Sequence, residues 1–149
     1  MTTLEKISSV IAEDLDNFKK AYHKSLQSSN PLLKEIVAHV TKSSGKMMRP
    51  TLVLLSAKIS GGITEKTVKP AVALELLHVA SLIHDDVVDN SAERRGLPSV
   101  MAEFKNKAAV LGGDFFLSTA LCEAVSTQTI DVVGTIASLG RTLIDGELL

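Results

Sequence analysis

The 149-residue chain has few of the residues that mark several protein classes. Aromatic residues make up only 3% of it, and its formal net charge is −1. Proteins that bind nucleic acid typically show a basic face with aromatic side chains that stack on bases, so we expect no nucleic-acid partner. The single cysteine, Cys122, excludes a disulfide framework and suits a reducing compartment. We expect it to be a small buried hydrophobic residue.

Targeting and membrane-spanning patterns are also lacking. The first residues, Met-Thr-Thr-Leu-Glu-Lys, do not have the charged-then-apolar layout of a signal peptide. The longest apolar region, residues 70–84, is interrupted by Glu75, His78 and His84. It is also shorter than the roughly 20 apolar residues that span a bilayer. We therefore expect a soluble, cytoplasmic protein with no transmembrane segment.

No alternating strand pattern longer than four residues is present, which disfavours β-structure. Apolar residues instead recur every three or four positions, and hydrophobic residues make up 45% of the chain, enough for one domain with a sizeable core. Asn30 and Pro31 suit the start of one helix, and Thr64 can cap another. The spacing predicts an all-α fold with helices at residues 4–27, 31–42, 48–59, 64–89, 107–126 and 129–149.

Two features predict that the chain is part of something larger. The stretch 68–88 is apolar nearly all the way round, so a helix there must be surrounded by others, as in the core of a large bundle. The other predicted helices make only a thin shell for it. Residues 144–149 also stop within a helical pattern, without a cap glycine or a following proline. We expect residues 1–149 to be the N-terminal part of a larger domain, or a protomer that needs a partner.

Residues 82–96 combine three carboxylates with two adjacent arginines. Asp85 and Asp89 (i, i+4) fall on one helix face, and Asp86 lies beside them. Like charges at this spacing, near a helix C-terminus, do not stabilise a helix. Mg²⁺ binds one or two carboxylates together with water and phosphate oxygens, and Arg94 and Arg95 carry planar groups that suit phosphate. The stretch predicts a site for a metal-bound diphosphate. A solvated acidic helix end or a weak calcium site are alternatives, although the EF-hand pattern is absent.

A second basic segment, Gly45 to Pro50, lies at a helix entrance. Lys46 and Arg49 are three residues apart and share one side of a turn. Helix N-termini attract anions, so two cations there favour a diphosphate site. The alternative is a solvated basic turn in which Gly45 caps the preceding helix.

The remaining candidates are histidines and glycines. His78 lies on the same helix stripe as Asp85, seven residues earlier, although a lone histidine on an apolar helix can also be a satisfied core residue. His84 lies about 100° off that stripe, so we expect it to be structural. We expect His23 and His39 to be surface residues. Gly112 and Gly113 together cost a helix interior about 2 kcal/mol relative to alanine, which favours a close helix–helix approach over a contact with substrate.

From about residue 30 onward the chain resembles the trans-type polyprenyl diphosphate synthases, which make farnesyl, geranylgeranyl and longer prenyl diphosphates. The shared elements occur in the family's order and spacing. They are Gly45-Lys46-x-x-Arg49-Pro50, Glu75-x-x-His78, Asp85-Asp86-x-x-Asp89 followed by Arg94-Arg95-Gly96, Gly113-Asp114-Phe115, and the ending Asp145-Gly146-Glu147. Each element is weak by itself, but the ordered set is specific.

The resemblance implies an isoprenoid-synthase-like orthogonal helical bundle, here truncated, with Mg²⁺ dependence and usually a homodimer. It implies that an allylic prenyl diphosphate ionises and that isopentenyl diphosphate attacks the cation. Lys46, Arg49, His78 and Arg95 match positions that hold isopentenyl diphosphate, in an element that begins with Gly45. Arg94 matches a contact to the allylic diphosphate. The catalytic aspartate-rich motif is matched by Asp85, Asp86 and Asp89, with Asp85 and Asp89 as expected metal ligands.

Two further expectations follow from the resemblance. Ala80 and Ser81, just below Asp85, are small where short-chain synthases have bulky aromatics, which suggests a product longer than farnesyl. The family's second aspartate-rich motif does not occur in these residues, so this chain alone should be nearly inactive. It is then a piece of a synthase, a subunit whose partner carries the other motif, or a non-catalytic module that binds prenyl diphosphate or docks on a synthase. A terpene cyclase is a further alternative, although cyclases generally lack the Gly-Lys-x-x-Arg-Pro element.

Overall fold

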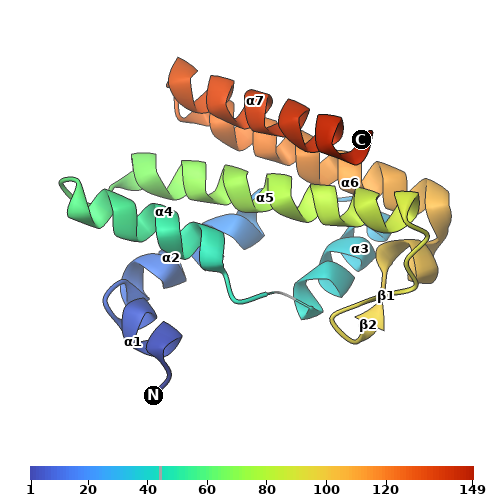
Figure 1. Ribbon diagram of the computed structural model, residues 1–149, viewed down its shortest axis with the longest axis horizontal. Helices are drawn as coiled ribbons and strands as arrows, with labels where there is room; N and C mark the ends of the chain where they lie inside the picture. Colours follow the sequence, from blue (N-terminus) through green and yellow to red (C-terminus); the bar gives the residue numbers. More distant parts are fainter. Residues whose placement is uncertain (44) are drawn as a thin grey trace.

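The computed structural model describes residues 1–43 and 45–149, and this part of the chain is helical apart from one short hairpin (Figure 1). The all-α prediction is therefore confirmed. The elements are α1 (Thr3–Ser9), α2 (Ala12–Ser25), α3 (Pro31–Lys42), α4 (Met48–Ile59), α5 (Glu65–Val88), β1 (Glu93–Arg94), β2 (Leu97–Pro98), α6 (Val100–Ser126) and α7 (Ile130–Glu147).

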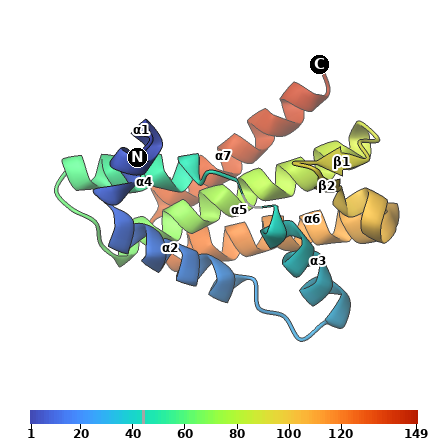
Figure 2. The same ribbon diagram turned by 90° about the horizontal axis from the view of Figure 1, so that it is seen from below.

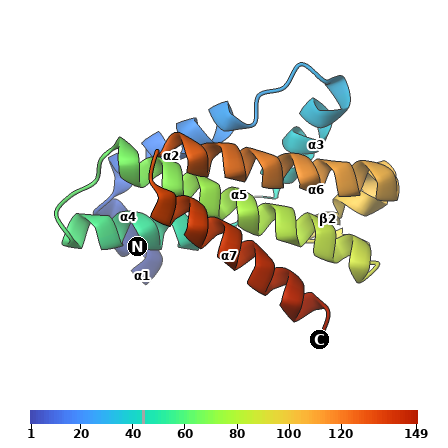
Figure 3. The same ribbon diagram turned by 90° about the horizontal axis from the view of Figure 1, so that it is seen from above.

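Helix α5 is the centre of the molecule, as its all-round apolar sequence predicts. It packs most extensively on α6 and also against α2, α4 and α7. Figure 2 shows α2 and α3 on one side of this pair, and Figure 3 shows α7 running obliquely beside it. Short buried side chains let α5 and α6 approach closely; they are Ala73 and Ala80 on α5 and Ala109, Ala120 and Ala124 on α6.

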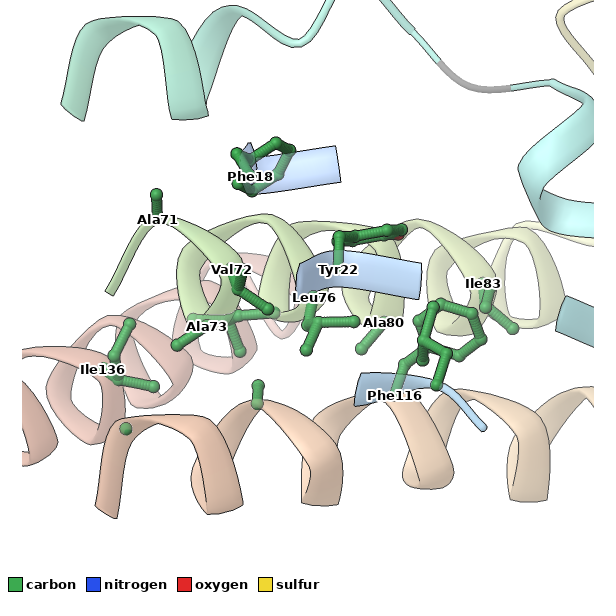
Figure 4. Packing of buried hydrophobic residues seen from close by; sticks show 14 of the residues in the cluster. Phe18, Tyr22, Ala71, Val72, Ala73, Leu76, Ala80, Ile83, Phe116 and Ile136 are labelled. Carbon is green, nitrogen blue, oxygen red and sulfur yellow. The ribbon is translucent and has the colours of Figure 1, made fainter. Parts of the chain in front are cut away.

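Large side chains from the surrounding helices fill the space around α5 (Figure 4). Phe18 of α2 and Phe116 of α6 are fully buried, and Ile136 is the buried contribution of α7. Each such side chain contributes about 1.5–3 kcal/mol by leaving water. α7 otherwise exposes much of its apolar surface, for example Leu143 and Ile144.

The predicted first helix, residues 4–27, is wrong in one respect, because it is broken into α1 and α2 at Val10 and Ile11. Ile11 has a non-helical backbone (φ −123°, ψ 24°), and its side chain is 1% exposed. The break frees the carbonyl of Val10, which accepts a hydrogen bond from Lys58 Nζ at 2.9 Å. The burial of Ile11 and this hydrogen bond from α4 offset the helical hydrogen bonds that the break removes. Neither contact can be predicted from the spacing of apolar residues.

The predicted caps are confirmed. Asn30 Oδ1 accepts hydrogen bonds from the backbone N–H groups of Leu32 and Leu33, at 2.9 and 3.1 Å, and Pro31 is the first residue of α3. Thr64 Oγ1 accepts from the N–H of Lys66 at 3.1 Å. These bonds satisfy donors that a helix start leaves unpaired, so they fix where α3 and α5 begin.

The segment between α5 and α6 differs from its prediction. Residues 93–98 form a hairpin in which Arg94 pairs with Leu97, and the two turn residues Arg95 and Gly96 have φ values of +53° and +79°. Two positive φ values are typical of a type I′ turn, whose twist matches that of the strands. α6 begins at Val100, with Ser99 as its N-cap, and Lys105 (φ +76°) forms a kink inside it. The predicted start at residue 107 therefore marks the regular helix beyond the kink.

Two expectations about α6 have different outcomes. Cys122 is exposed, not buried, because it lies about 200° around the helix from the buried Ala120. Within the described residues, α6 is long and apolar enough to cross a membrane, but it packs against α3, α5 and α7. The absence of a membrane span therefore stays a prediction.

Candidate functional site

The candidate residues form two neighbouring groups on and around α5. One side of α5 borders a cavity of about 420 Å³ that α2, α3, α5, the start of α4 and the hairpin enclose. α5 contributes a stripe at helical spacing, which consists of Glu75, His78, Val79, Leu82, Ile83 and Asp86. Asp85 and Asp89 lie at the edge of this face of α5, and neither is among the residues that line the cavity.

The cavity collects the basic residues that the sequence singled out. Lys46 and Arg49 come from the segment that leads into α4, and Arg94 and Arg95 come from the hairpin. Gly45 and His78 also line the cavity, so it brings together six predicted substrate-binding residues from three separate segments. The concentration of positive charge makes the cavity suited to a polyvalent anion.

The backbone before α4 has a specific conformation that places Lys46 and Arg49. Met47 adopts a left-handed conformation (φ +56°, ψ 40°) as the N-cap of α4. Its carbonyl accepts two hydrogen bonds from Thr51, one from the backbone N–H at 3.1 Å and one from Oγ1 at 2.7 Å. Lys46 therefore precedes the helix and Arg49 lies in its first turn, at the positive end of the helix dipole.

Gly45 allows the guanidinium of Arg95 to lie against the backbone. A Cβ atom at residue 45 would lie 2.7 Å from Arg95 Nη2, so the guanidinium would have to move away from its position. The alternative role for Gly45, as the cap of the preceding helix, is not observed, because Ser43 caps α3. Ser44 lies outside the described residues.

Asp86 is separated from the other two aspartates. Its carboxylate faces the cavity side and accepts two hydrogen bonds from Arg94, from Nε and Nη2, each at 2.8 Å. The side chain of Asp86 is 5% exposed. The hydrogen bond to Asp86 raises the pKa of Arg94 above its usual value. Asp86 therefore fixes an arginine of the cavity, and one residue of helical rotation explains why it does not face the same way as Asp85.

His78 is a neutral group among the cations. Burial first, and then the positive charges of Arg49, Arg94 and Arg95, lower the pKa of His78 to about 4. A neutral imidazole has one N–H donor and one acceptor nitrogen. At neutral pH it can donate a hydrogen bond to a bound anion.

Glu75 and Tyr22 form the acidic and phenolic part of the cavity wall. Glu75 is 7% exposed, and its Oε2 has no hydrogen-bond partner among the described residues. Burial raises the pKa of Glu75, while the charges of Arg49 and Arg95 act in the opposite direction. Burial and then the charge of Glu75 raise the pKa of the Tyr22 hydroxyl above its usual range.

Tyr22 is one of several cavity residues that sequence reasoning missed. Lys19, Tyr22 and His23 line the cavity from α2, at a spacing (i, i+3, i+4) that any amphipathic helix shows. His39 of α3 also lines it, which corrects its expected surface position: it is half-buried, and its Nε2 lies 2.7 Å from the carbonyl oxygen of Pro98. His23 is exposed, as predicted.

Asp85 lies in the last turn of α5 and Asp89 is its C-cap, and both act electrostatically on Glu147, the last residue of α7. The negative charge of Asp85 foremost, then partial desolvation and the charge of Asp89, raise the pKa of Glu147. Across residues 1–43 and 45–149, no three His, Cys, Asp or Glu side chains gather closely enough to hold a metal ion. Two carboxylates one turn apart still fit Mg²⁺, because phosphate oxygens and water supply its other ligands.

Close helix contacts explain the two glycines of α6. A Cβ at Gly112 would lie 3.3 Å from Ile36 Cγ2 of α3, and a Cβ at Gly113 would overlap the imidazole of His84. His84 Nε2 lies 3.0 Å from the carbonyl oxygen of Val110 and 3.3 Å from Asp114 Oδ1. The predictions that these glycines permit close approach and that His84 is structural are both confirmed.

Comparison with known proteins points to one family. Residues 30–149 match the family model described as polyprenyl synthetase. The chain is 33% identical to the octaprenyl diphosphate synthase of Escherichia coli (strain K12) over 146 residues, which cover 98% of this chain and 45% of that protein. It is 37% identical over 113 residues to component 2 of the heptaprenyl diphosphate synthase of Bacillus subtilis (strain 168), covering 76% of this chain and 32% of the relative.

The fold also matches solved structures closely. A polyprenyl synthase from Caulobacter crescentus CB15, complexed with calcium and isoprenyl diphosphate, superposes with a TM-score of 0.93 at 27% identity. The match covers 98% of this chain and 44% of that one. The chain thus spans less than half the length of these similar proteins.

Proposed function

The chain belongs to the polyprenyl synthetase family, and from that premise we propose that it provides two diphosphate sites of a prenyltransferase. The reaction joins isopentenyl diphosphate to an allylic prenyl diphosphate. The cavity binds isopentenyl diphosphate directly, and Asp85 and Asp89, which lie beside it, bind the allylic diphosphate through Mg²⁺. Residues outside these 149 complete the catalytic centre.

The observation that carries this proposal is that the basic residues line the cavity, while Asp85 and Asp89 lie beside it at the edge of the same face of α5. Lys46, Arg49 and Arg95 line a cavity in which cations exceed carboxylates, so a diphosphate needs no metal there. Asp85 and Asp89 are carboxylates with no basic partner among the described contacts, so a diphosphate reaches them only through a cation. A condensation of two diphosphates needs two such distinct sites.

In the reaction, the allylic C–O bond breaks and its electron pair leaves with the diphosphate. The double bond of isopentenyl diphosphate attacks the resulting cation, and loss of a proton gives the longer product. Mg²⁺, when bound by Asp85 and Asp89, stabilises negative charge on the departing oxygens. Lys46, Arg49, His78 and Arg95 hold the second substrate in place, and Val79, Leu82 and Ile83 give the cavity an apolar wall that excludes water from the cation.

The product is proposed to be longer than farnesyl. Ala80 is small and buried, and the Ser81 hydroxyl donates to the carbonyl of His78 at 2.6 Å, so neither side chain extends as a bulky floor below Asp85. The names of the relatives, octaprenyl and heptaprenyl diphosphate synthases, also support a product longer than farnesyl.

The partner is proposed to be a second copy of the chain or a polypeptide that carries the second aspartate-rich motif. The name "component 2" of one relative supports a protein that works together with another part. The same name supports, as a second candidate function, a non-catalytic subunit that binds prenyl diphosphate and docks on a complete synthase.

Chain extension from farnesyl diphosphate and isopentenyl diphosphate, in Mg²⁺, tests the proposal. We expect little product from this chain alone and products longer than farnesyl when a C-terminal half from a relative is supplied. A supplied half that binds the chain without giving any product would favour the non-catalytic subunit. Isopentenyl diphosphate that fails to bind the chain at all would refute the proposed prenyltransferase site in the cavity.

A further inference from the structure

The imidazole of His84 occupies a fitted position on one turn of α6. Its Nε2 contacts the carbonyl oxygen of Val110 at 3.0 Å and Asp114 Oδ1 at 3.3 Å. Both neighbours are acceptors, so Nε2 carries the hydrogen and donates it. Gly113 lies between them in sequence and is the residue whose missing side chain leaves room for the ring. One turn of α6 thus provides two hydrogen-bond acceptors for His84, from Val110 and Asp114, and the space beside Gly113 that its ring fills.

This contact lies directly beside the aspartates. His84 precedes Asp85, and α5 ends four residues later at Val88. Helix ends open easily because their last carbonyls lack helical partners, and like charges at i, i+4 weaken the turn further. Asp85 and Asp89 are also linked through the backbone, since the N–H of Asp89 donates to the carbonyl of Asp85 at 2.8 Å. Opening of this turn would therefore move the two carboxylates relative to each other.

We propose that His84, seated on the Val110–Asp114 turn of α6, is a positioning residue that holds the last turn of α5, and with it Asp85 and Asp89, in the geometry that binds a metal diphosphate. The inference rests on the proposed function of those two aspartates. It assigns Gly113 the role of leaving space for the imidazole of His84, and Asp114 the role of accepting a hydrogen bond from it.

Hydrogen exchange in the 149-residue chain tests the mechanical part without any ligand. In His84→Ala, the amides of residues 87–90 should exchange about ten-fold faster, relative to those of residues 72–80, than in the wild type. A uniform increase along α5, or none at all, would overturn the proposal, because either result means that His84 does not act on the last turn in particular.

A double-mutant cycle tests whether Gly113 acts through the ring. Gly113→Ala should speed exchange of residues 87–90 in the wild-type background and have no such effect in the His84→Ala background. Gly112→Ala is the matched control, because its methyl group meets Ile36 of α3 instead. Equal effects of Gly113→Ala in both backgrounds would contradict the proposal.

Binding of inorganic pyrophosphate, with Mg²⁺ or with a chelator, tests the link to function. His84→Ala should weaken the Mg²⁺-dependent binding about ten-fold and leave chelator-resistant binding unchanged, since small displacements of ligating groups are costly. His84→Gln, whose amide can donate to the same acceptors, should lose less. Equal binding by the wild type and His84→Ala would refute the positioning role alone. A wild type with no Mg²⁺-dependent binding would refute the proposed metal site and the positioning role with it.

Discussion

Two arginines of the cavity are held by neighbouring groups, Arg94 by a carboxylate and Arg95 by the backbone, whereas Asp85 and Asp89 lie close to a further carboxylate. Asp86 binds Arg94 through two hydrogen bonds, and Arg95 lies over Gly45. The charges of Asp85 and Asp89, by contrast, raise the pKa of Glu147. Two arginines of the cavity are thus in place before any ligand binds, while a cation bound at the aspartates would offset their mutual repulsion.

The largest expected effect comes from removing the metal ligands. Asp85→Ala or Asp89→Ala, in the assembly that has activity, should lower turnover by about 10³-fold or more, because several kcal/mol of charge stabilisation at the leaving group are lost. Steady-state kinetics in saturating Mg²⁺ measures this. Binding of isopentenyl diphosphate in the cavity should not change, and an unchanged turnover would remove the proposed metal site.

A smaller effect is expected from the cavity cations. Lys46→Ala or Arg95→Ala should weaken isopentenyl diphosphate binding about 10- to 150-fold, since a hydrogen bond to a charged group contributes about 1.5–3 kcal/mol. Titration calorimetry measures the affinity. Lys24→Ala removes the same charge from an exposed position of α2 outside the cavity and is the control. If only the allylic substrate binds more weakly, the assignment of the two sites is wrong.

The two neighbouring aspartates should differ in their effect on stability. Asp86→Asn weakens the paired hydrogen bonds to Arg94 and should lower the free energy of unfolding by about 1–3 kcal/mol, towards the lower value because Arg94 is partly exposed. Asp89→Asn removes a negative charge from a helix C-terminus and should have little effect or stabilise slightly. Urea unfolding of both variants measures the difference. Equal losses would mean that the Asp86–Arg94 pair does not stabilise the fold.

The smallest expected effect is a pH dependence of the free energy of unfolding that arises from His78 in the cavity. Because the folded state holds the pKa of His78 near 4, below the 6.5 of a free histidine, the unfolded chain binds the extra proton between these values. His78 therefore costs stability as the pH falls from 6.5 to 4, and none of this cost is present above pH 6.5. Unfolding free energies across this window should fall less steeply in His78→Gln than in the wild type. The exposed His23→Gln should behave as the wild type, and identical slopes in all three proteins would contradict the lowered pKa.

Local sequence predicts the features that depend on backbone chemistry and periodicity. The caps at Asn30 and Thr64 are such features, and so is the central position of α5. The break at Ile11 and the hairpin could not be predicted, because one depends on burial and a bond to Lys58, and the other is only two residues per strand. These depend on contacts distant in sequence or on very short patterns.

The sequence predicts which residues form the candidate site, but not how they divide between the cavity and the Asp85–Asp89 pair. Helical spacing groups Asp85, Asp86 and Asp89, yet only the folded hairpin shows that Asp86 binds Arg94. The contribution of Tyr22 from α2 has no signal in the sequence, because its spacing is that of ordinary core packing. The role of Gly45 similarly becomes visible only when Arg95, fifty residues later, lies against it.

The central claim is that one side of α5 binds a diphosphate without a metal ion. The most direct test is calorimetric titration of this chain with isopentenyl diphosphate in the presence of a chelator. We expect saturable binding at a single site that Arg95→Ala weakens strongly and Asp85→Ala leaves intact. Binding that appears only with Mg²⁺, or that is lost in Asp85→Ala but kept in Arg95→Ala, would contradict the account.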